Sequence, residues 1–381
     1  MNGRHTNPQL SQSPQTSHAP QMPPGSPAAR SPLTTSRRGL LGAAGGAAVA
    51  GALGPFSGVA AADSARHPQG GRNEDYGFGK GGDLPLDRIG IQLFTVRDLL
   101  ADNELDLSRT FEMLADAGYA EFEIGGDYDG RTPAQLRKLA DAHGLKVAGN
   151  HFGPRGMVEN IWYDPKERAR IYEEAHALGL KAVGTGHSYT APRTVDGYKR
   201  MAAAFNVWGR EAVRNGFDYF YFHNHDVEFT LVDGAPLYDI LLEETDPRYV
   251  KFELDLGWIE ISGQSAYEYI SRDPERFPLF HVKDIRWDPN GNREAQPGTA
   301  NAGKRFFFTD PGKGDVDYPR IFSALKNPAH HHFLVEHDDA GNDETADENS
   351  PRPLNPAGSA NTAWTGRKYL ANLEIPRRKR H

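Results

Sequence analysis

The chain of 381 residues contains no cysteine. Disulfides, thiolate nucleophiles and cysteine metal sites are therefore excluded, and any metal must be held by His, Asp, Glu or water. An excess of positive charge is also lacking, since the formal charge is -8 and the isoelectric point is about 6.0. This balance argues against a polyanionic partner, so we expect no binding of nucleic acid.

A dinucleotide-binding fingerprint is lacking as well. The segment that follows the first predicted strand reads FTVRDLLADN (94–103), with no G-x-G-x-x-G pattern. Glycine-rich pieces follow the third and fourth predicted strands, but they have neither a Walker lysine nor the spacing of a Rossmann turn. The sequence therefore does not favour a nucleotide cofactor.

No convincing membrane-spanning run is present, but the N-terminus has the pattern of an export signal. Residues 1–35 are rich in Pro, Ser, Gln and Thr, which predicts disorder. Arg37 and Arg38 precede a Gly/Ala-rich apolar run that Gly54-Pro55 interrupts, and residues 60–62 offer a small-residue cleavage site. We predict a disordered n-region and twin-arginine signal peptide over 1–62, no stable membrane anchor, and an extracellular or cell-envelope location. Residues 63–84 read as a linker.

From residue 85 to 375 strand patterns alternate with amphipathic helix patterns. Strands are predicted at 88–96, 120–126, 146–153, 181–186, 218–223, 250–258, 279–285 and 331–338. Helices are predicted at 109–118, 132–144, 165–179, 194–216, 265–277, 317–327 and 359–373. Eight such units predict an α/β fold, a single-domain (β/α)8 TIM barrel, because regular alternation implies parallel strands with right-handed crossovers.

Ionisable residues collect at the predicted C-terminal strand ends, where such barrels build active sites. Asp255, His281 and Glu336 each interrupt an apolar run, in FELDLGW, LFHVKD and FLVEHD. A buried carboxylate without a partner is costly, so three intrusions on three successive strands favour one bound cation over three separate ion pairs. Carboxylates with imidazoles and no sulfur suit one divalent ion, Mn²⁺, Zn²⁺, Co²⁺ or Mg²⁺.

The fifth strand must supply the fourth ligand, and its segment DYFYFHNHDVEF (218–229) offers three candidates. Strand alternation places His223 and His225 on the same face, with His223 nearer the end of the strand, and Glu228 follows on the loop. We predict His223 as the ligand, which leaves His225 and Glu228 for proton transfer. Glu123, His151 and His187 follow strands two to four and are predicted to line the substrate pocket, although each has an alternative as a polar residue paired locally.

Five motifs together resemble the sugar phosphate isomerase/epimerase superfamily, the xylose isomerase-like TIM barrels. They are IGIQLFTVRD, FHNHDVEF, ELDLGW, FHVKD and GKGDVDYPRIFSAL, spread over roughly residues 86–373. The resemblance implies one divalent metal held by Glu, Asp, His and Glu, of which the last three match Asp255, His281 and Glu336. It departs at strand five, where His223 stands in place of the glutamate.

The resemblance also implies a reaction. The metal holds adjacent oxygens of a sugar, and a base removes the proton beside the carbonyl to give an enediolate. Glu228 or His225 is the expected base, Lys283 is expected to stabilise the oxyanion, and Trp258 and Phe94 are expected to bind the apolar face of the sugar. The chain is thus expected to be a sugar isomerase or epimerase with a small carbohydrate as partner. The alternatives are β-elimination on 3-keto-glycosides, and a sugar-binding protein without catalysis.

Overall fold

The computed structural model describes residues 82–101, 107–125, 128–153, 164–186, 192–341 and 358–376, all within the compact unit Arg66–His381. The predicted signal peptide and residues 63–81 of the predicted linker lie outside the described residues. The linker's last residues already belong to the barrel, because the Gly82 and Asp83 amides donate to the carbonyls of Ala371 and Leu373. Across the described ranges, no helix has the length and apolarity needed to cross a membrane.

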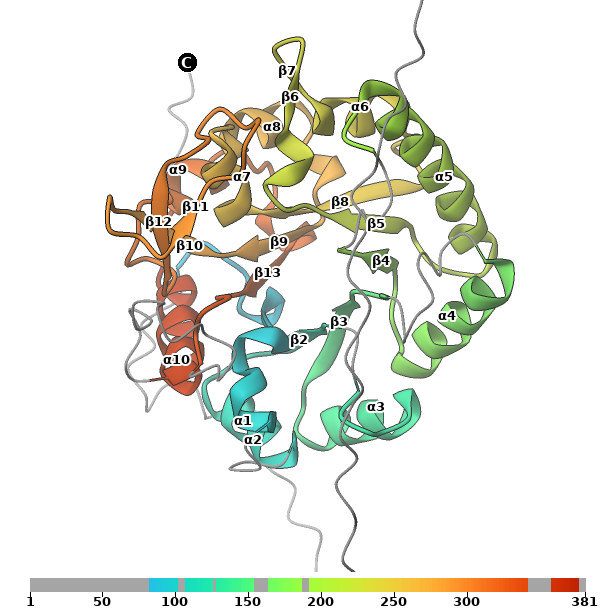
Figure 1. Cartoon of the computed structure of the whole chain (residues 1–381). Coiled ribbons are helices and arrows are strands. Elements are labelled where there is room, and N and C mark those ends of the chain that lie inside the picture. Colours follow the sequence, from blue (N-terminus) through green and yellow to red (C-terminus); the bar gives the residue numbers. More distant parts are fainter. Residues whose placement is uncertain are drawn as a thin grey trace, which may run out of the picture. The chain divides into compact units, whose positions relative to one another are not determined.

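Eight parallel strands form a nearly closed barrel, which confirms the predicted fold (Figure 1). They are β1 (Ile89–Gln92), β2 (Glu121–Ile124), β3 (Lys146–Asn150), β4 (Val183–Thr185), β5 (Phe220–His223), β8 (Val250–Asp255), β9 (Leu279–Val282) and β13 (His332–Val335). Their order is β3-β2-β1-β13-β9-β8-β5-β4. A parallel bridge between His151 and Gly184 joins the two ends of this order, so the barrel closes beside β3.

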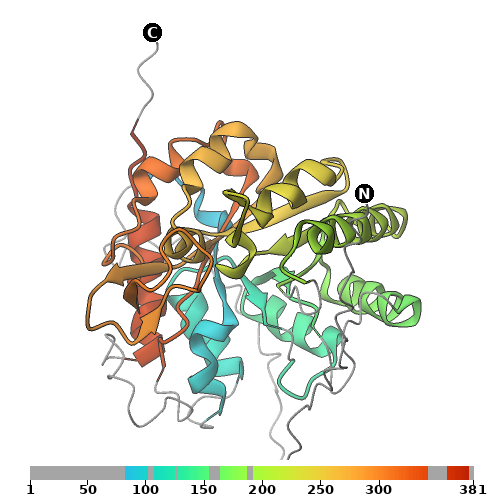
Figure 2. The ribbon, with the colours of Figure 1, turned by 45° about the horizontal axis from the view of Figure 1, so that its top comes forward.

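The helices lie around the outside of the strands (Figures 1 and 2). They are α1 (Arg97–Ala101), α2 (Leu107–Asp116), α3 (Pro133–Ala142), α4 (Pro165–Leu178), α5 (Val195–Arg214), α6 (Leu237–Glu244), α7 (Leu256–Ser262), α8 (Ala266–Arg272), α9 (Tyr318–Phe322) and α10 (Gly358–Ala371). Three were not predicted. α1 and α6 fall in segments left without an element, and α7 begins inside the predicted strand 250–258, so that strand ends at Asp255.

Side-chain alternation along β5 explains which residues face the interior. Phe220 and Phe222 point outward, and their ring centroids lie 5.1 and 5.0 Å from that of Phe205 on α5. Tyr221 and His223 therefore face the inside of the barrel, as the period of two requires. The outward-facing rings of Phe220 and Phe222 pack β5 against α5. The alternate residues Tyr221 and His223 point into the barrel.

Short antiparallel excursions follow two of the barrel strands. β6 (Leu231–Val232) and β7 (Ala235–Pro236) form a hairpin after β5, which projects at the rim in Figure 1. After β9 the chain forms the sheet β10–β12–β11 from Asp284–Trp287, Arg305–Thr309 and Arg293–Glu294. The predicted strand 279–285 is therefore two strands of different sheets, with Lys283 between them at the mouth of the barrel.

Candidate metal centre

The four residues predicted as ligands come together at the C-terminal end of the barrel. His281 Nδ1 lies 2.6 Å from Glu336 Oε2 and 3.8 Å from Asp255 Oδ2, and His223 Nε2 lies 4.0 Å from the same Asp255 oxygen. His223, Asp255 and His281 expose 2% of their surface or less, and Glu336 exposes 6%. Asp255, His281 and Glu336 thus form one compact buried donor group, which His223 approaches through Asp255, and binding of a metal stays a prediction.

Asp255 is oriented by the start of the helix that follows it. Its Oδ1 accepts the Trp258 amide at 2.8 Å, which makes Asp255 the N-cap of α7. Its own amide donates to Asn224 Oδ1 at 3.1 Å, on the loop after β5. The cap leaves Oδ2 directed at His223 and His281, so the unpredicted helix α7 is what aims the carboxylate.

The ammonium group of Lys283 lies among the carboxylates of this centre. Lys283 Nζ is 2.9 Å from Asp255 Oδ2, 2.9 Å from Glu336 Oε2 and 3.0 Å from Asp338 Oδ1. Burial alone would lower the pKa of Lys283, but the charges of Asp255 and Asp338 outweigh it and raise that pKa well above its usual range. The mouth of the barrel therefore already attracts a positive charge.

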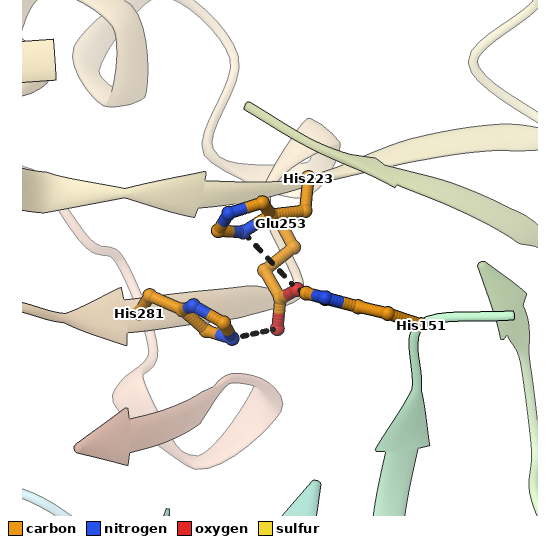
Figure 3. A group of neighbouring side chains, drawn as sticks. All are labelled: His151, His223, Glu253 and His281. Carbon is orange, nitrogen blue, oxygen red and sulfur yellow. Dashed lines mark hydrogen bonds and ion pairs between the residues drawn. The ribbon is translucent and has the colours of Figure 1, made fainter. Parts of the chain in front are cut away.

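A second polar layer lies deeper in the barrel, beneath the two imidazoles. Figure 3 shows Glu253 with its carboxylate between His151, His223 and His281. His151 Nε2 lies 2.7 Å from Glu253 Oε2, and His281 Nε2 lies 2.7 Å from Glu123 Oε2 and 3.2 Å from Glu253 Oε1. Both glutamates are fully buried. Glu123 thus lies below His281 instead of lining an open pocket, and the partly buried His151 also reaches this layer.

Glu253 is the main residue that the sequence reasoning did not select. It precedes Asp255 by two positions on the same strand, so alternation alone places both side chains inside the barrel. The polar residues Gln92 and Tyr221 were missed in the same way. They face Glu123, with Gln92 Nε2 donating to its Oε2 and the Tyr221 hydroxyl to its Oε1, each at 2.8 Å.

His281 connects the two layers. Its short contacts to Glu336 through Nδ1 and to Glu123 through Nε2 need a hydrogen on both nitrogens. Burial opposes the charged imidazole, but Glu253 and Glu336 outweigh it and raise the pKa of His281 well above its usual range. The proton on Nδ1 thus occupies the side of the ring that faces the predicted ligands.

The pKa values of His223 and Asp255, two of the other three predicted ligands, are also shifted. Burial, and then the neighbouring His281, hold the pKa of His223 well below its usual range, so its imidazole is neutral and has a lone pair to offer. Burial raises the pKa of Asp255 to about 6, although Lys283 acts in the opposite direction. A nearby divalent cation would favour the ionised form of this carboxylate.

The donor separations fit a single small cation. Nitrogen and oxygen ligands about 2.0–2.2 Å from an ion lie roughly 3–4 Å from one another. The pairs joining Asp255 to His223 and to His281 fall in this range, at 4.0 and 3.8 Å, and the pair joining His281 to Glu336 is shorter by the length expected when a proton bridges it. Two carboxylates and two imidazoles thus match a Zn²⁺, Mn²⁺ or Co²⁺ site in type and in spacing.

The predicted base candidates differ in their surroundings. Glu228 is buried, its Oε2 accepts the His225 amide at 2.7 Å, and its charge acts on Tyr198 and Tyr238 of the outer helices. The His225 ring is partly exposed and lies 4.9 Å from the His223 ring and 5.8 Å from that of Trp258, measured between centroids. The arrangement leaves His225 at the mouth and turns Glu228 toward the backbone.

The residues predicted to contact the substrate lie in different surroundings. Trp258 lies in the first turn of α7, and its ring centroid lies 5.2 Å from Lys283 Nζ and 5.2 Å from the Phe308 ring, so it forms part of the wall above the centre. Phe94 is 43% exposed and stacks under the Arg97 guanidinium at 3.9 Å. His187 lies outside the described residues.

Two of the sequence motifs meet directly behind Lys283. The Asp284 carboxylate accepts the amides of Ile285, Gly312, Gly314 and Val316 at 2.8–3.2 Å. A Cβ at Gly314 would lie 2.2 Å from Asp284 Oδ1, so this close approach needs glycine. FHVKD and GKGDVDY are therefore one structural unit that fixes the backbone from which Lys283 enters the site.

Fold and centre together define a (β/α)8 barrel with a candidate metal site at the carboxyl ends of its strands. The family profile described as xylose isomerase-like TIM barrel matches residues 111–355, and the chain belongs to this family.

Similar proteins give this family membership a chemical context. The inosose dehydratase of Lacticaseibacillus casei is 28% identical over 295 residues, covering 72% of this chain and 93% of that protein. A sugar phosphate isomerase/epimerase from Parabacteroides distasonis superimposes with a TM-score of 0.54 at 22% identity, covering 74% and 93% of the two chains. The structure of IOLI protein with a zinc atom bound gives 0.53 at 16% identity, with 74% and 95% covered.

Proposed function

We propose that this chain is a divalent-metal-dependent lyase that eliminates water, or an alkoxy group, from the carbon β to the carbonyl of a keto-sugar or keto-cyclitol. The convergence of Asp255, His281 and Glu336, with His223 4.0 Å from Asp255, carries the proposal, because it supplies donors for a Lewis-acid metal where such barrels bind substrate. The inosose dehydratase relative supports elimination over isomerisation, since its name states a dehydration.

His223, Asp255, His281 and Glu336 would hold the cation, which would polarise the substrate carbonyl and stabilise negative charge on its oxygen. The Lys283 ammonium lies within ion-pair distance of two of these ligands, so it is placed to donate a hydrogen bond to the same oxygen. The fold neighbour with bound zinc supports zinc as one candidate metal.

We assign proton abstraction to His225. Its ring lies at the mouth between His223 and Trp258, whereas the Glu228 carboxylate is committed to the His225 amide. His225 takes the proton from the carbon beside the carbonyl, and the electron pair of that bond forms the carbon–carbon double bond. The β carbon–oxygen bond breaks, the leaving hydroxyl takes up a proton to depart as water, and an enone results.

The test is metal analysis of the purified protein, followed by incubation with an inosose and with a 3-keto-glycoside in D₂O. We expect about one divalent ion per chain, ultraviolet absorbance from the conjugated enone, and deuterium beside the carbonyl in recovered substrate. Deuterium exchange with a new sugar isomer and no enone would instead establish isomerisation or epimerisation. A metal-free protein that binds the sugar without exchange would contradict catalysis altogether.

We further propose that the mature enzyme is exported by the twin-arginine route, on the strength of Arg37, Arg38 and the run that follows. Replacing both arginines with lysine should leave the full-length protein in the cytoplasm of an expressing bacterium. Immunoblots of cell fractions would check this, and a processed, exported double variant would contradict it.

A further inference from the structure

The floor beneath the candidate metal centre is made by two glutamates from opposite sides of the barrel. Glu123 on β2 and Glu253 on β8 are both 0% exposed. The contacts of Glu253 are all imidazoles, and Glu123 contacts His281, His151 and two neutral donors. Buried carboxylates are expensive, so their retention here calls for a role.

Each predicted imidazole ligand has one nitrogen on this floor and the other on the Asp255 side. His281 reaches Asp255 Oδ2 with Nδ1 at 3.8 Å and Glu123 Oε2 with Nε2 at 2.7 Å. His223 Nε2 lies 4.0 Å from Asp255 Oδ2, and its Nδ1 lies 3.5 Å from Glu253 Oε2, within ion-pair distance but without a hydrogen bond. The two rings enter from different strands, yet both connect a glutamate below to the Asp255 carboxylate above.

Glu123 is itself held from both sides. Gln92 donates to Oε2 and Tyr221 to Oε1, each at 2.8 Å. Gly149 makes room for this arrangement, because a Cβ there would lie 2.4 Å from Glu123 Oε1 and 2.6 Å from the Tyr221 hydroxyl. The carboxylate thus has a fixed direction before any ligand arrives.

We propose that Glu123 and Glu253 are positioning residues that hold His281 and His223 in the tautomers and orientations needed to offer Nδ1 and Nε2 to the cation. The inference rests on the metal centre proposed above and adds its supporting layer. A histidine that donates its second N–H to a carboxylate is a stronger and better oriented metal ligand, and loss of the carboxylate weakens metal affinity about 10–100-fold.

The experiment compares Glu123→Gln, Glu253→Gln and Tyr221→Phe with the control Glu121→Gln. Glu121 is a buried glutamate on the same strand as Glu123, and it pairs with His332 at 2.6 Å. Zn²⁺ dissociation constants are measured by competition with a chelating dye, Co²⁺ absorption spectra report ligand geometry, and thermal unfolding of the metal-free proteins reports folding.

We expect affinity about 10–100-fold weaker for Glu123→Gln and Glu253→Gln, a smaller loss for Tyr221→Phe, altered Co²⁺ spectra, and an unchanged dissociation constant for Glu121→Gln. Unchanged affinity and spectra in folded variants of both glutamates would overturn the positioning role while leaving the metal centre intact. If either variant fails to fold, the Tyr221→Phe affinity and spectrum decide, since that change removes only the hydroxyl.

Two other results would change the roles assigned to the metal centre and to the two glutamates beneath it. Wild-type protein that binds no metal would defeat the proposed function, and the inference with it. Wild-type protein that binds two ions, of which Glu253→Gln loses one, would show that His151, His223, Glu253 and His281 ligate a cation themselves, and it would replace positioning by ligation.

Discussion

Each end of the barrel holds a buried glutamate–histidine pair, and the two ends balance charge differently. At the N-terminal end of the strands, Glu121 Oε1 lies 2.6 Å from His332 Nδ1, and Arg88 Nη1 lies 2.9 Å from His332 Nε2. One carboxylate is thus matched by one guanidinium through a neutral imidazole. The charges of these groups therefore balance without a bound ion.

At the C-terminal end, carboxylates outnumber fixed cations. Lys283 is the lysine that contacts them, and the carboxylates are Glu123, Glu253, Asp255, Glu336 and Asp338. Such an excess is costly at low dielectric constant unless protons or a metal ion offset it. The difference indicates that a Glu–His pair is structural where its charge is matched locally, and is a candidate cation site where it is not.

The largest effects should come from the ligands at the C-terminal end. Asp255→Asn and His281→Ala should lose stoichiometric metal and measurable turnover, because each removes a donor from a four-residue set. His332→Ala removes the imidazole of the pair at the other end and should keep both. Metal analysis after dialysis against a weak chelator, with circular dichroism to verify folding, checks this, and full occupancy in His281→Ala would contradict the site.

The next largest effect separates chemistry from metal binding at the same end. His225→Asn should lower kcat by about 10²–10⁴-fold with metal content unchanged, as expected for loss of a general base. Glu228→Gln keeps an oxygen that accepts the His225 amide, so its kcat should fall much less. Steady-state kinetics of the two metal-loaded variants checks this order, and a greater loss in Glu228→Gln would exchange the two roles.

The sequence predicted the eight strands and the neighbourhood of Asp255, His281 and Glu336 because both depend on local patterns, and their role as ligands stays a prediction. Strand periodicity located the eight strands of the barrel, and the interruption of apolar runs singled out Asp255, His281 and Glu336. The histidine partners of the glutamates at the two ends of the barrel could not be predicted in this way. Glu121 and Glu123 have the same residue type, strand and alternation, and only the neighbouring strands decide that one meets His332 and the other His281.

Element boundaries failed where a side chain ends the element. Asp255 caps α7, so the strand predicted to reach residue 258 ends three residues earlier, at Asp255, and LGW becomes helical. The sheet β10–β12–β11 depends on pairing between Asp284–Trp287 and a segment about twenty residues later, which no local pattern indicates. Glu253 received no role because its partners, His151, His223 and His281, come from three other strand ends, which no local pattern pairs with it.

A smaller effect is expected when either of two glycines, one at each end of the barrel, is replaced by alanine. A Cβ at Gly184 would lie 2.4 Å from the Tyr221 ring, and one at Gly90 would lie 2.5 Å from Leu334 Cδ2. Overpacking of either site should cost about 1–3 kcal/mol in the free energy of unfolding. Gly184→Ala should also weaken Zn²⁺ binding, because Tyr221 orients Glu123, whereas Gly90→Ala should not. Urea unfolding with Zn²⁺ titration checks both, and equal Zn²⁺ affinity in the two variants would contradict the difference.

The smallest effect concerns the pH response of the N-terminal end. His331 is buried there, its Nδ1 lies 2.8 Å from the Phe277 carbonyl to which it donates, and burial lowers its pKa. The unfolded chain therefore takes up a proton near the usual histidine pKa of about 6.5 that the folded chain takes up only at lower pH, so stability is lost as the pH falls below that value. His331→Gln keeps a donor but cannot titrate. The stability advantage of wild type over this variant, measured by urea unfolding in the metal-free proteins, should shrink from about pH 7.5 to about pH 5.5. A constant difference would show that His331 accepts its proton as readily when folded, and that this end of the barrel is open to water.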